Sequence, residues 1–314
     1  MELNQLKKEV KVIGKAKSIE RVREGQTRNG KDYLAYTLTV MVKNEKNNTL
    51  DEIRVEFFST DGTAPYKSQT KYFNEAKTSD NVGYDDADLV SVFGELDLQE
   101  YKNRKTGKET SFNSIKGVFI HRLDEDMKHR AVANVETVIT SIEDKLNEED
   151  LPTGEKTLTG FTIGYNERII ELVGLTVPSS LADEISKIYK PYQTTQLTLQ
   201  FINRAVNDGK EQEQEQEEVT SAFGTIADTD AGSPVFTTYD NRTLVIGGTP
   251  PFLDEGELSE DEIEQALKLR KEQKSKNLEV KDYTPKQETK QSNNTNDVFN
   301  QGFGSEGNDE IPDF

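Results

Sequence analysis

The sequence predicts a mainly β protein made of two successive five-stranded barrels, each with a short helix, followed by a further helix and a disordered acidic tail. Three observations lead to this prediction. Segments in which apolar and polar residues alternate recur through the first 250 residues, and this is the period of a half-buried strand. The order of strands and helix in the first part recurs in the second. From about residue 277 the chain is polar and has no periodicity, which is typical of a segment that cannot bury a core.

Three strands open the chain. Residues 9–24 alternate between basic side chains at odd positions and apolar or small ones at even positions, which predicts a long strand with one basic face. Asn29-Gly30 then indicates a hairpin, and residues 31–43 and 51–59 alternate in the same way. The odd-numbered basic residues of the first strand are Lys11, Lys15, Lys17, Arg21 and Arg23.

A helix and two strands follow. Residues 63–77 have the apolar spacing of a short helix, residues 80–88 form an acidic loop, and residues 89–101 and 110–123 alternate as strands around a basic hairpin loop. Three strands, a helix and two more strands is the order of the OB-fold, a small Greek-key barrel. We therefore predict an OB-fold over about residues 9–125.

The second half repeats this order without repeating the sequence. The run of Glu and Gln at residues 211–218 interrupts it and is most simply a solvated loop. We predict a second OB-like barrel over about residues 131–250. Its expected strands are residues 132–146, 156–165, 168–177, 196–206, 219–226 and 242–247, with a helix at 178–189.

A capping box begins the last predicted helix. Ser259-Glu260-Asp261-Glu262 places a hydroxyl before the first turn and a Glu three residues later. Acidic residues in the first turn and basic ones towards the end suit the helix dipole. We expect this helix to pack on the second barrel or to bridge to a neighbouring subunit.

Composition excludes several classes of function. The chain has 314 residues, no cysteine and two histidines, so thiol catalysis, disulfides and cysteine metal sites are excluded and a histidine metal centre is not expected. No catalytic constellation or phosphate-binding loop is present, and the acidic run Asp85–Asp88 lacks the spacing of a calcium loop. We therefore expect no enzyme, metal or cofactor. No apolar run reaches the roughly 20 residues of a membrane span, and no signal peptide opens the chain, so a cytoplasmic protein is expected.

The net charge of −19 is unevenly distributed. Residues 1–130 carry a net charge of +1, residues 131–256 carry −14 and residues 257–314 carry −6. Only the first segment suits a polyanion, provided that its cations share a face. The acidic second barrel is expected to serve subunit contacts or geometry instead.

The chain ends in an acidic cluster, Ile-Pro, and a Phe that carries the terminal carboxylate. This tip resembles the tail tip of bacterial and phage single-stranded DNA-binding proteins, with an additional Asp313 before Phe314. The resemblance implies that the tip recruits replication or recombination proteins, with the ring in an apolar pocket and the acids near basic residues. The tip residues are Asp309, Glu310, Ile311, Pro312, Asp313 and Phe314.

Binding of a single strand needs cations for the phosphates and exposed rings for the bases. OB barrels usually provide both on strands 2 and 3 and on the loops between strands 1 and 2 and between strands 4 and 5. The alternatives are that Tyr33 and Phe58 cover a barrel end or meet the second domain, that Tyr101 and Phe112 only pair across their hairpin, and that the basic loop is merely solvated. The candidate residues are Lys15, Lys17, Arg21, Arg23, Arg28, Lys31, Tyr33, Arg54, Phe58, Tyr101, Lys102, Arg104, Lys105, Lys108 and Phe112.

We expect a protein that coats and protects single-stranded DNA without sequence specificity in phage or bacterial replication and recombination. We expect it to act in the bacterial cytoplasm, to consist of four parts and to self-associate through its second domain. Two alternatives remain: an OB-fold adaptor that binds proteins only, and a metal-dependent nuclease that uses the acidic loop. The expected parts are residues 1–130 (OB-fold, DNA-binding), 131–256 (second OB-like domain), 257–276 (helix) and 277–314 (disordered tail with the tip).

Overall fold

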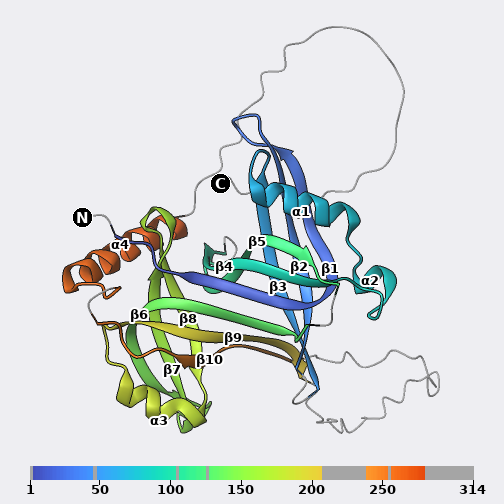
Figure 1. Ribbon diagram of the computed structural model, residues 1–314. Helices are drawn as coiled ribbons and strands as arrows, with labels where there is room; N and C mark the ends of the chain where they lie inside the picture. The colour runs from blue at the N-terminus through green and yellow to red at the C-terminus, as the bar shows by residue number, and fades with distance from the viewer. Residues whose placement is uncertain are drawn as a thin grey trace, which may run out of the picture. The chain divides into compact units, whose positions relative to one another are not determined.

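The computed structural model describes a protein dominated by one continuous ten-stranded sheet. The sheet is folded into two barrels, and the described residues belong to one compact unit, residues 1–279 (Figure 1). The predicted strand 219–226 and the C-terminal tip lie outside the described residues. The described ranges are 3–44, 48–103, 106–124, 127–206, 238–253 and 256–279.

The first barrel is closed because its long first strand, β1, pairs with two strands that would otherwise be the edges of the sheet. Strand β1 pairs with β2 and also with β4, and the remaining ladders join β2 to β3, β3 to β5 and β5 to β4. The ladder between β3 and β5 is parallel and the others are antiparallel, which is the OB-fold closure. The elements are β1 (Lys8–Gln26), β2 (Asp32–Asn44), β3 (Thr49–Thr60), α1 (Ala64–Glu75), α2 (Ser79–Val82), β4 (Leu89–Lys102) and β5 (Glu109–Arg122).

The second barrel has the same connectivity. Strand β6 pairs with β7 and β9, and a parallel ladder between β8 and β10 completes the ring. The predicted tandem OB-fold is therefore confirmed, whereas the division into separate domains stays a prediction. The elements are β6 (Arg130–Leu146), β7 (Pro152–Ile163), η1 (Tyr165–Glu167), β8 (Ile169–Val177), α3 (Ser179–Ile188), β9 (Thr194–Val206) and β10 (Thr238–Gly248).

The two barrels share strand pairing and core. Residues 8–13 of β1 lie between β4 and β6, with Val10 opposite Ala133 and Val12 opposite Ala131. One apolar cluster runs from Leu38 in the first barrel through these residues to Leu197 in the second. The barrels are thus joined by backbone hydrogen bonds and by buried apolar contacts, which is stronger than a simple surface contact.

Helix α4 (Glu260–Leu278) packs on the second barrel and also reaches the first. The capping box at Ser259 and Glu262 is present, as predicted. Ile263 and Ala266 are buried beside strands of the second barrel. Arg270 lies further along the helix and contacts β4 as well as β8. The helix therefore bridges the two barrels of one chain.

Two expectations for the first barrel are wrong in detail. The basic face of residues 9–24 is not continuous, because Ile13 at an odd position is 1% exposed and register shifts follow Ala16 and Glu20. Each such bulge changes which side chains face outward. The acidic loop at residues 80–88 contains the short helix α2, which its polar sequence did not indicate.

Candidate nucleic-acid interface

A cation and two rings lie together on the outer face of strands β1, β2 and β3. Arg23 is opposite Ala35, and Ala35 is opposite Phe58 on its other side, so the three residues form one row across the sheet. Tyr33 lies on the same face, two residues before Ala35, and its ring centroid is 5.8 Å from that of Phe58. Phe58 is 57% exposed. The small Ala35 leaves space between the guanidinium and the rings.

The register shift after Glu20 is what brings Arg23 into this row. Glu20 is opposite Thr37 and Arg23 is opposite Ala35, so three residues of β1 span two of β2. Arg21 adopts a positive φ of 52° within this irregularity. Without the bulge, strict alternation from Glu20 would have turned Arg23 to the other face. The bulge therefore places the cation where the two rings are.

A second ring pair lies on the hairpin formed by β4 and β5. Tyr101 and Phe112 meet edge to face with centroids 6.5 Å apart, and they are 50% and 42% exposed. Phe112 is opposite Gln99, two residues from Tyr101, so both rings are on the same face of the hairpin. They are pair partners across the hairpin, as one alternative expected, and they are also open to solvent.

The second barrel and α4 hold the opposite face of this hairpin. The Asn113 side chain donates to the Glu171 carbonyl at 2.8 Å and accepts from the Val173 amide at 2.7 Å. The Arg270 guanidinium donates to Glu100 at 2.9 Å and to Glu171 at 2.6 Å. Burial opposes the charge of Glu100, but hydrogen bonds from Arg270, Asn277 and Ser111 outweigh it and lower the pKa of Glu100. We call these contacts of Asn113 and Arg270 the brace of the hairpin. The brace leaves the rings of Tyr101 and Phe112 on the outward side.

The two ring pairs belong to one continuous outer face. The Gln99 side chain donates to Glu56 on β3 at 3.3 Å and to Ser114 on β5 at 3.4 Å. Phe57 is opposite Gly117 in a parallel ladder, so Phe58 is level with Val118, six residues along β5 from Phe112. At about 3.3 Å per residue the ring pairs are about 20 Å apart. Rings at the two ends of one OB face suit an extended chain of several stackable groups.

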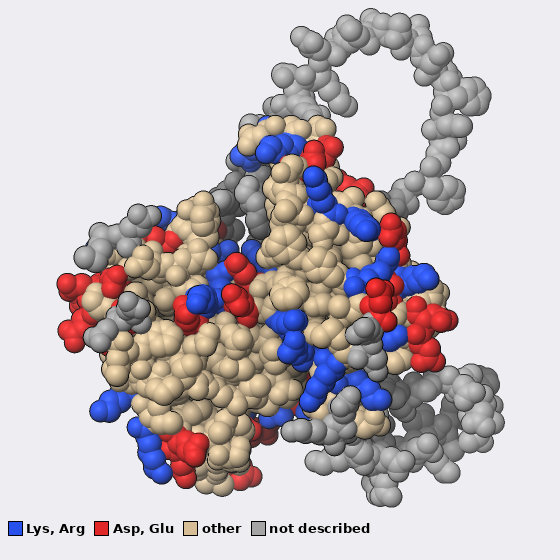
Figure 2. All heavy atoms as spheres, viewed as in Figure 1, with Lys and Arg blue, Asp and Glu red and all other residues tan. Residues whose placement is uncertain are grey.

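Not all candidate cations gather on this face. Lys15 donates to the carbonyls of Asp85 and Ala87 at 2.8 and 3.0 Å, and Lys17 pairs with Glu52. Lys102 lies 3.9 Å from Glu109. Arg54 is exposed on the ring-bearing face, four residues before Phe58 on β3. Arg21, Arg28, Lys31 and Lys108 are exposed on the first barrel and its hairpins, whereas Arg104 and Lys105 lie outside the described residues. Figure 2 shows basic side chains at the end of the β1–β2 hairpin and, mixed with acids, along the junction of the barrels.

Sequence reasoning missed several residues of this surface. Lys116 is opposite Glu56 and pairs with Asp97 at 2.5 Å, and Arg168 of the second barrel also reaches Asp97 at 3.1 Å. Phe93 is 42% exposed, with the Lys11 ammonium 4.6 Å from its centroid. The alternation of Val90 and Val92 inward could have indicated that Phe93 faces outward. The contact of Arg168 could not have been found, because it joins different barrels.

The described residues contain neither a candidate metal site nor a candidate membrane-spanning helix. Within the described ranges, no group of three or more His, Cys, Asp or Glu side chains is placed to hold a metal ion. The same part of the chain contains no helix with the length and apolar character needed to cross a membrane.

The strand pairing and the ring-bearing face define a two-barrel OB-fold protein with a candidate nucleic-acid interface on its first barrel. Residues 7–280 match the family model described as YorF, so the chain belongs to the YorF family. Comparison with curated proteins finds no match.

The solved structures to which this chain is similar include three of single-stranded DNA binding proteins. The wild-type single-stranded DNA binding protein from Thermus aquaticus is 12% identical with a TM-score of 0.48, over 82% of this chain and 99% of that one. A deletion mutant of that protein is 13% identical with a TM-score of 0.46, over 80% and 97%. The mitochondrial single-stranded DNA binding protein Rim1 from S. cerevisiae is 12% identical with a TM-score of 0.25, over 40% and 100%. The fold assignment rests on the strand pairing of this chain.

Proposed function

We propose that this protein binds single-stranded DNA along the outer face of β2, β3, β5 and β4. The observation that carries the proposal is the pair of exposed ring clusters, Tyr33 with Phe58 and Tyr101 with Phe112, on one OB face. Each ring offers a surface on which a base can stack, and stacking does not read base edges. Binding would therefore tolerate sequence.

The charge on this face supports strand binding over duplex binding. Arg23 lies beside the first ring pair and Lys116 lies between the two pairs. Glu56 is also on this face, opposite Lys116, and its carboxylate would repel a phosphate group there. With few cations and several rings, base stacking has to contribute much of the affinity. A duplex, whose bases are already stacked, would gain only the charge contacts.

The biological role that we propose is to coat and protect exposed strands during replication or recombination. The tip Asp309–Phe314 would recruit partner proteins, as the resemblance of its sequence implies. The second domain would supply geometry and subunit contacts, because its segment carries a net charge of −14. These assignments extend the binding proposal and depend on it.

The test is fluorescence anisotropy of labelled oligo-dT at two salt concentrations, with a duplex of equal length as a control. Phe58→Ala should weaken binding by about 1–3 kcal/mol, or about 5- to 150-fold. Its effect on folding should be small, because the ring is 57% exposed. Tyr165→Ala removes an exposed ring from the second barrel and is the matched control.

Three outcomes would contradict the proposal. If the wild-type protein fails to bind oligo-dT at low salt, the adaptor function takes its place. If Phe58→Ala and Tyr165→Ala behave alike while the wild type binds, the strand lies on another surface. Equal affinity for strand and duplex would show that charge alone drives binding.

A further inference from the structure

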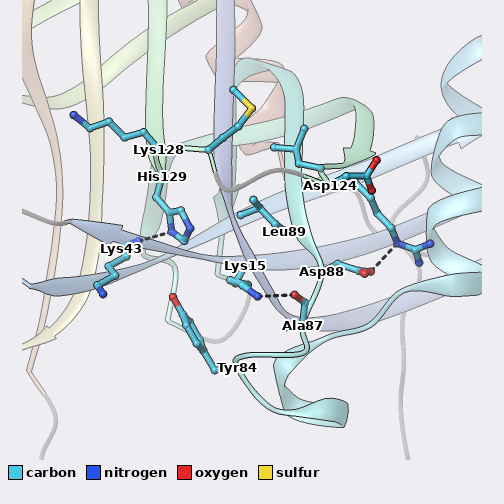
Figure 3. Close-up of a pocket in the computed structure, with 12 residues that line it drawn as sticks. Lys15, Lys43, Tyr84, Ala87, Asp88, Leu89, Asp124, Lys128 and His129 are labelled. Carbon is cyan, nitrogen blue, oxygen red and sulfur yellow. Dashed lines mark hydrogen bonds and ion pairs between the residues drawn. The ribbon is translucent and has the colours of Figure 1, made fainter.

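A pocket of about 720 Å³ lies beside the end of strand β2 that is opposite to Tyr33 (Figure 3). Lys43 of β2 and Lys15 of β1 form one side of it. The segment that leads into β4, with Tyr84 and Asp88, forms another side. Asp124 and Lys128, which lie between β5 and β6 in the sequence, line the remaining side. Its volume is in the range of small-molecule and cofactor sites.

Positive charge predominates among the described lining residues. Arg122 is neutralised by Asp88 at 2.9 Å and by Glu75 at 3.0 Å. Lys15 donates hydrogen bonds to two backbone carbonyls. Lys43 and Lys128 are exposed, and Asp124 is the other described acid of the lining. The pocket therefore favours an anionic ligand.

An aromatic ring accompanies these cations. Tyr84 is 39% exposed, and its ring centroid lies 5.8 Å from the Lys15 ammonium. Leu89, Leu123 and Met127 add apolar surface. A ring and apolar wall beside lysines combine what a base needs with what a phosphate needs. The chemistry of the pocket thus matches a nucleotide unit better than a simple inorganic anion.

The backbone of Lys43 connects the pocket to the sheet. Its amide donates to Nδ1 of His129 at 3.1 Å, which ties the β5–β6 connection to the end of β2. Lys43 also lies an even number of residues from Tyr33 and Ala35 on β2, so its side chain points to the same outer face. The ten residues from Tyr33 to Lys43 cover about 33 Å at about 3.3 Å per residue. The pocket is therefore at one end of the proposed interface.

We propose that this pocket receives a nucleotide of the bound single strand, with its phosphate at Lys43 and Lys128 and its base against Tyr84. This inference rests on the proposed function and extends the strand beyond the ring pairs to the junction of the two barrels. The path from Tyr33 and Phe58 to the pocket would pass over the exposed Arg54 of β3, because Thr37, Thr39 and Met41 of β2 are buried.

The test is the salt dependence of oligo-dT binding by K43A/K128A. Loss of two phosphate contacts should reduce the slope of log K against log salt by about 1.4, since each contact to a single strand contributes about 0.7. The matched control is K187A/K190A, which removes two exposed lysines from the second barrel. The control should leave the slope unchanged.

A crosslinking experiment tests occupancy directly. Oligo-dT with single 5-iodouracil substitutions is irradiated in complex with the full-length wild-type protein, and the crosslinked peptides are identified by mass spectrometry. We expect a crosslink to residues 84–89 or 122–129, and its loss in Tyr84→Ala.

The outcomes separate the two proposals. If Phe58→Ala weakens binding but K43A/K128A leaves the slope unchanged and no crosslink reaches the pocket, the pocket assignment is wrong and the proposed function stands. A reduced slope without a pocket crosslink also overturns the assignment, because the lysines then act at a distance. Absence of oligo-dT binding by the wild type overturns both.

Discussion

Glu100 shows how one buried residue links the hairpin of the first barrel to the rest of the chain. Its side chain is 1% exposed and pairs with Arg270 of α4. Because the pKa of Glu100 is lowered on folding, its charge stabilises the fold above the pKa of an unfolded Glu, near 4.5. That contribution is lost as the pH falls through the lower pKa of the folded state.

We predict that Glu100→Gln lowers the free energy of unfolding by about 1.5–3 kcal/mol at pH 7, the usual contribution of a hydrogen bond to a charged group. The difference from wild type should shrink at pH 3, which is below the pKa of an unfolded Glu, because protonation of the unfolded chain then offsets part of the contribution of the carboxylate. Urea unfolding followed by circular dichroism at both pH values measures it. Glu264→Gln is the control and should have little effect, because Glu264 is an exposed carboxylate on α4, the helix that carries Arg270. A loss of the same size at both pH values would contradict this account.

Some residue positions were predictable and others were not. The exposure of Phe58 follows from the alternation of Ile53, Val55 and Phe57 towards the core. The row of Arg23, Ala35 and Phe58 does not follow, because the bulge after Glu20 has no sequence signal that strict alternation could reveal. The cations assigned to one basic face therefore separate in the structure, with Lys15 at the pocket and Arg23 beside the rings.

At the scale of elements, strand β1 closes the first barrel and joins it to the second. It pairs with β6 through Ile13, with β4 through Lys15 and with β2 from Lys15 onward. Gly14 sits at this change of partner, and a Cβ there would be 2.2 Å from the Met41 carbonyl oxygen. Only a residue without a side chain allows the two strands to approach so closely.

We predict that Gly14→Ala destabilises the protein by about 1–3 kcal/mol or more, because the backbone of β2 has to shift. Gly247→Ala is the matched control, since no atom lies within 4 Å of its added Cβ. Thermal unfolding followed by circular dichroism compares the two variants. Equal melting temperatures for both would show that β1 and β2 separate easily at this point.

The elements themselves were largely predictable, because strands and helices depend on local patterns. The bounds of β2 and α4 lie within a few residues of the predicted 31–43 and 257–276. The brace of the β4–β5 hairpin was not predictable. It depends on Asn113 meeting the backbone of β8, 58 residues away in sequence from its acceptor Glu171, and no local pattern reports such a contact.

At the scale of the whole molecule, the two barrels behave structurally as one body. The β1–β6 ladder, the shared apolar cluster and the Arg168–Asp97 ion pair all cross between them. We predict that calorimetry of the full chain shows a single cooperative unfolding transition, because neither barrel can unfold without exposing apolar surface of the other. Two well-separated transitions would mean that the shared ladder contributes little.

The sequence by itself determined the class of fold and the order of most of its elements, and it supplied the candidate residues for the proposed contact with a single strand. Those properties follow from alternation, turn residues and local composition, which act over a few residues. Only the tertiary structure decided which candidates share a face, that α4 bridges both barrels, and that Lys43, Tyr84 and Lys128 surround one pocket. The physical reason is that strand register and barrel closure bring together residues far apart in the chain.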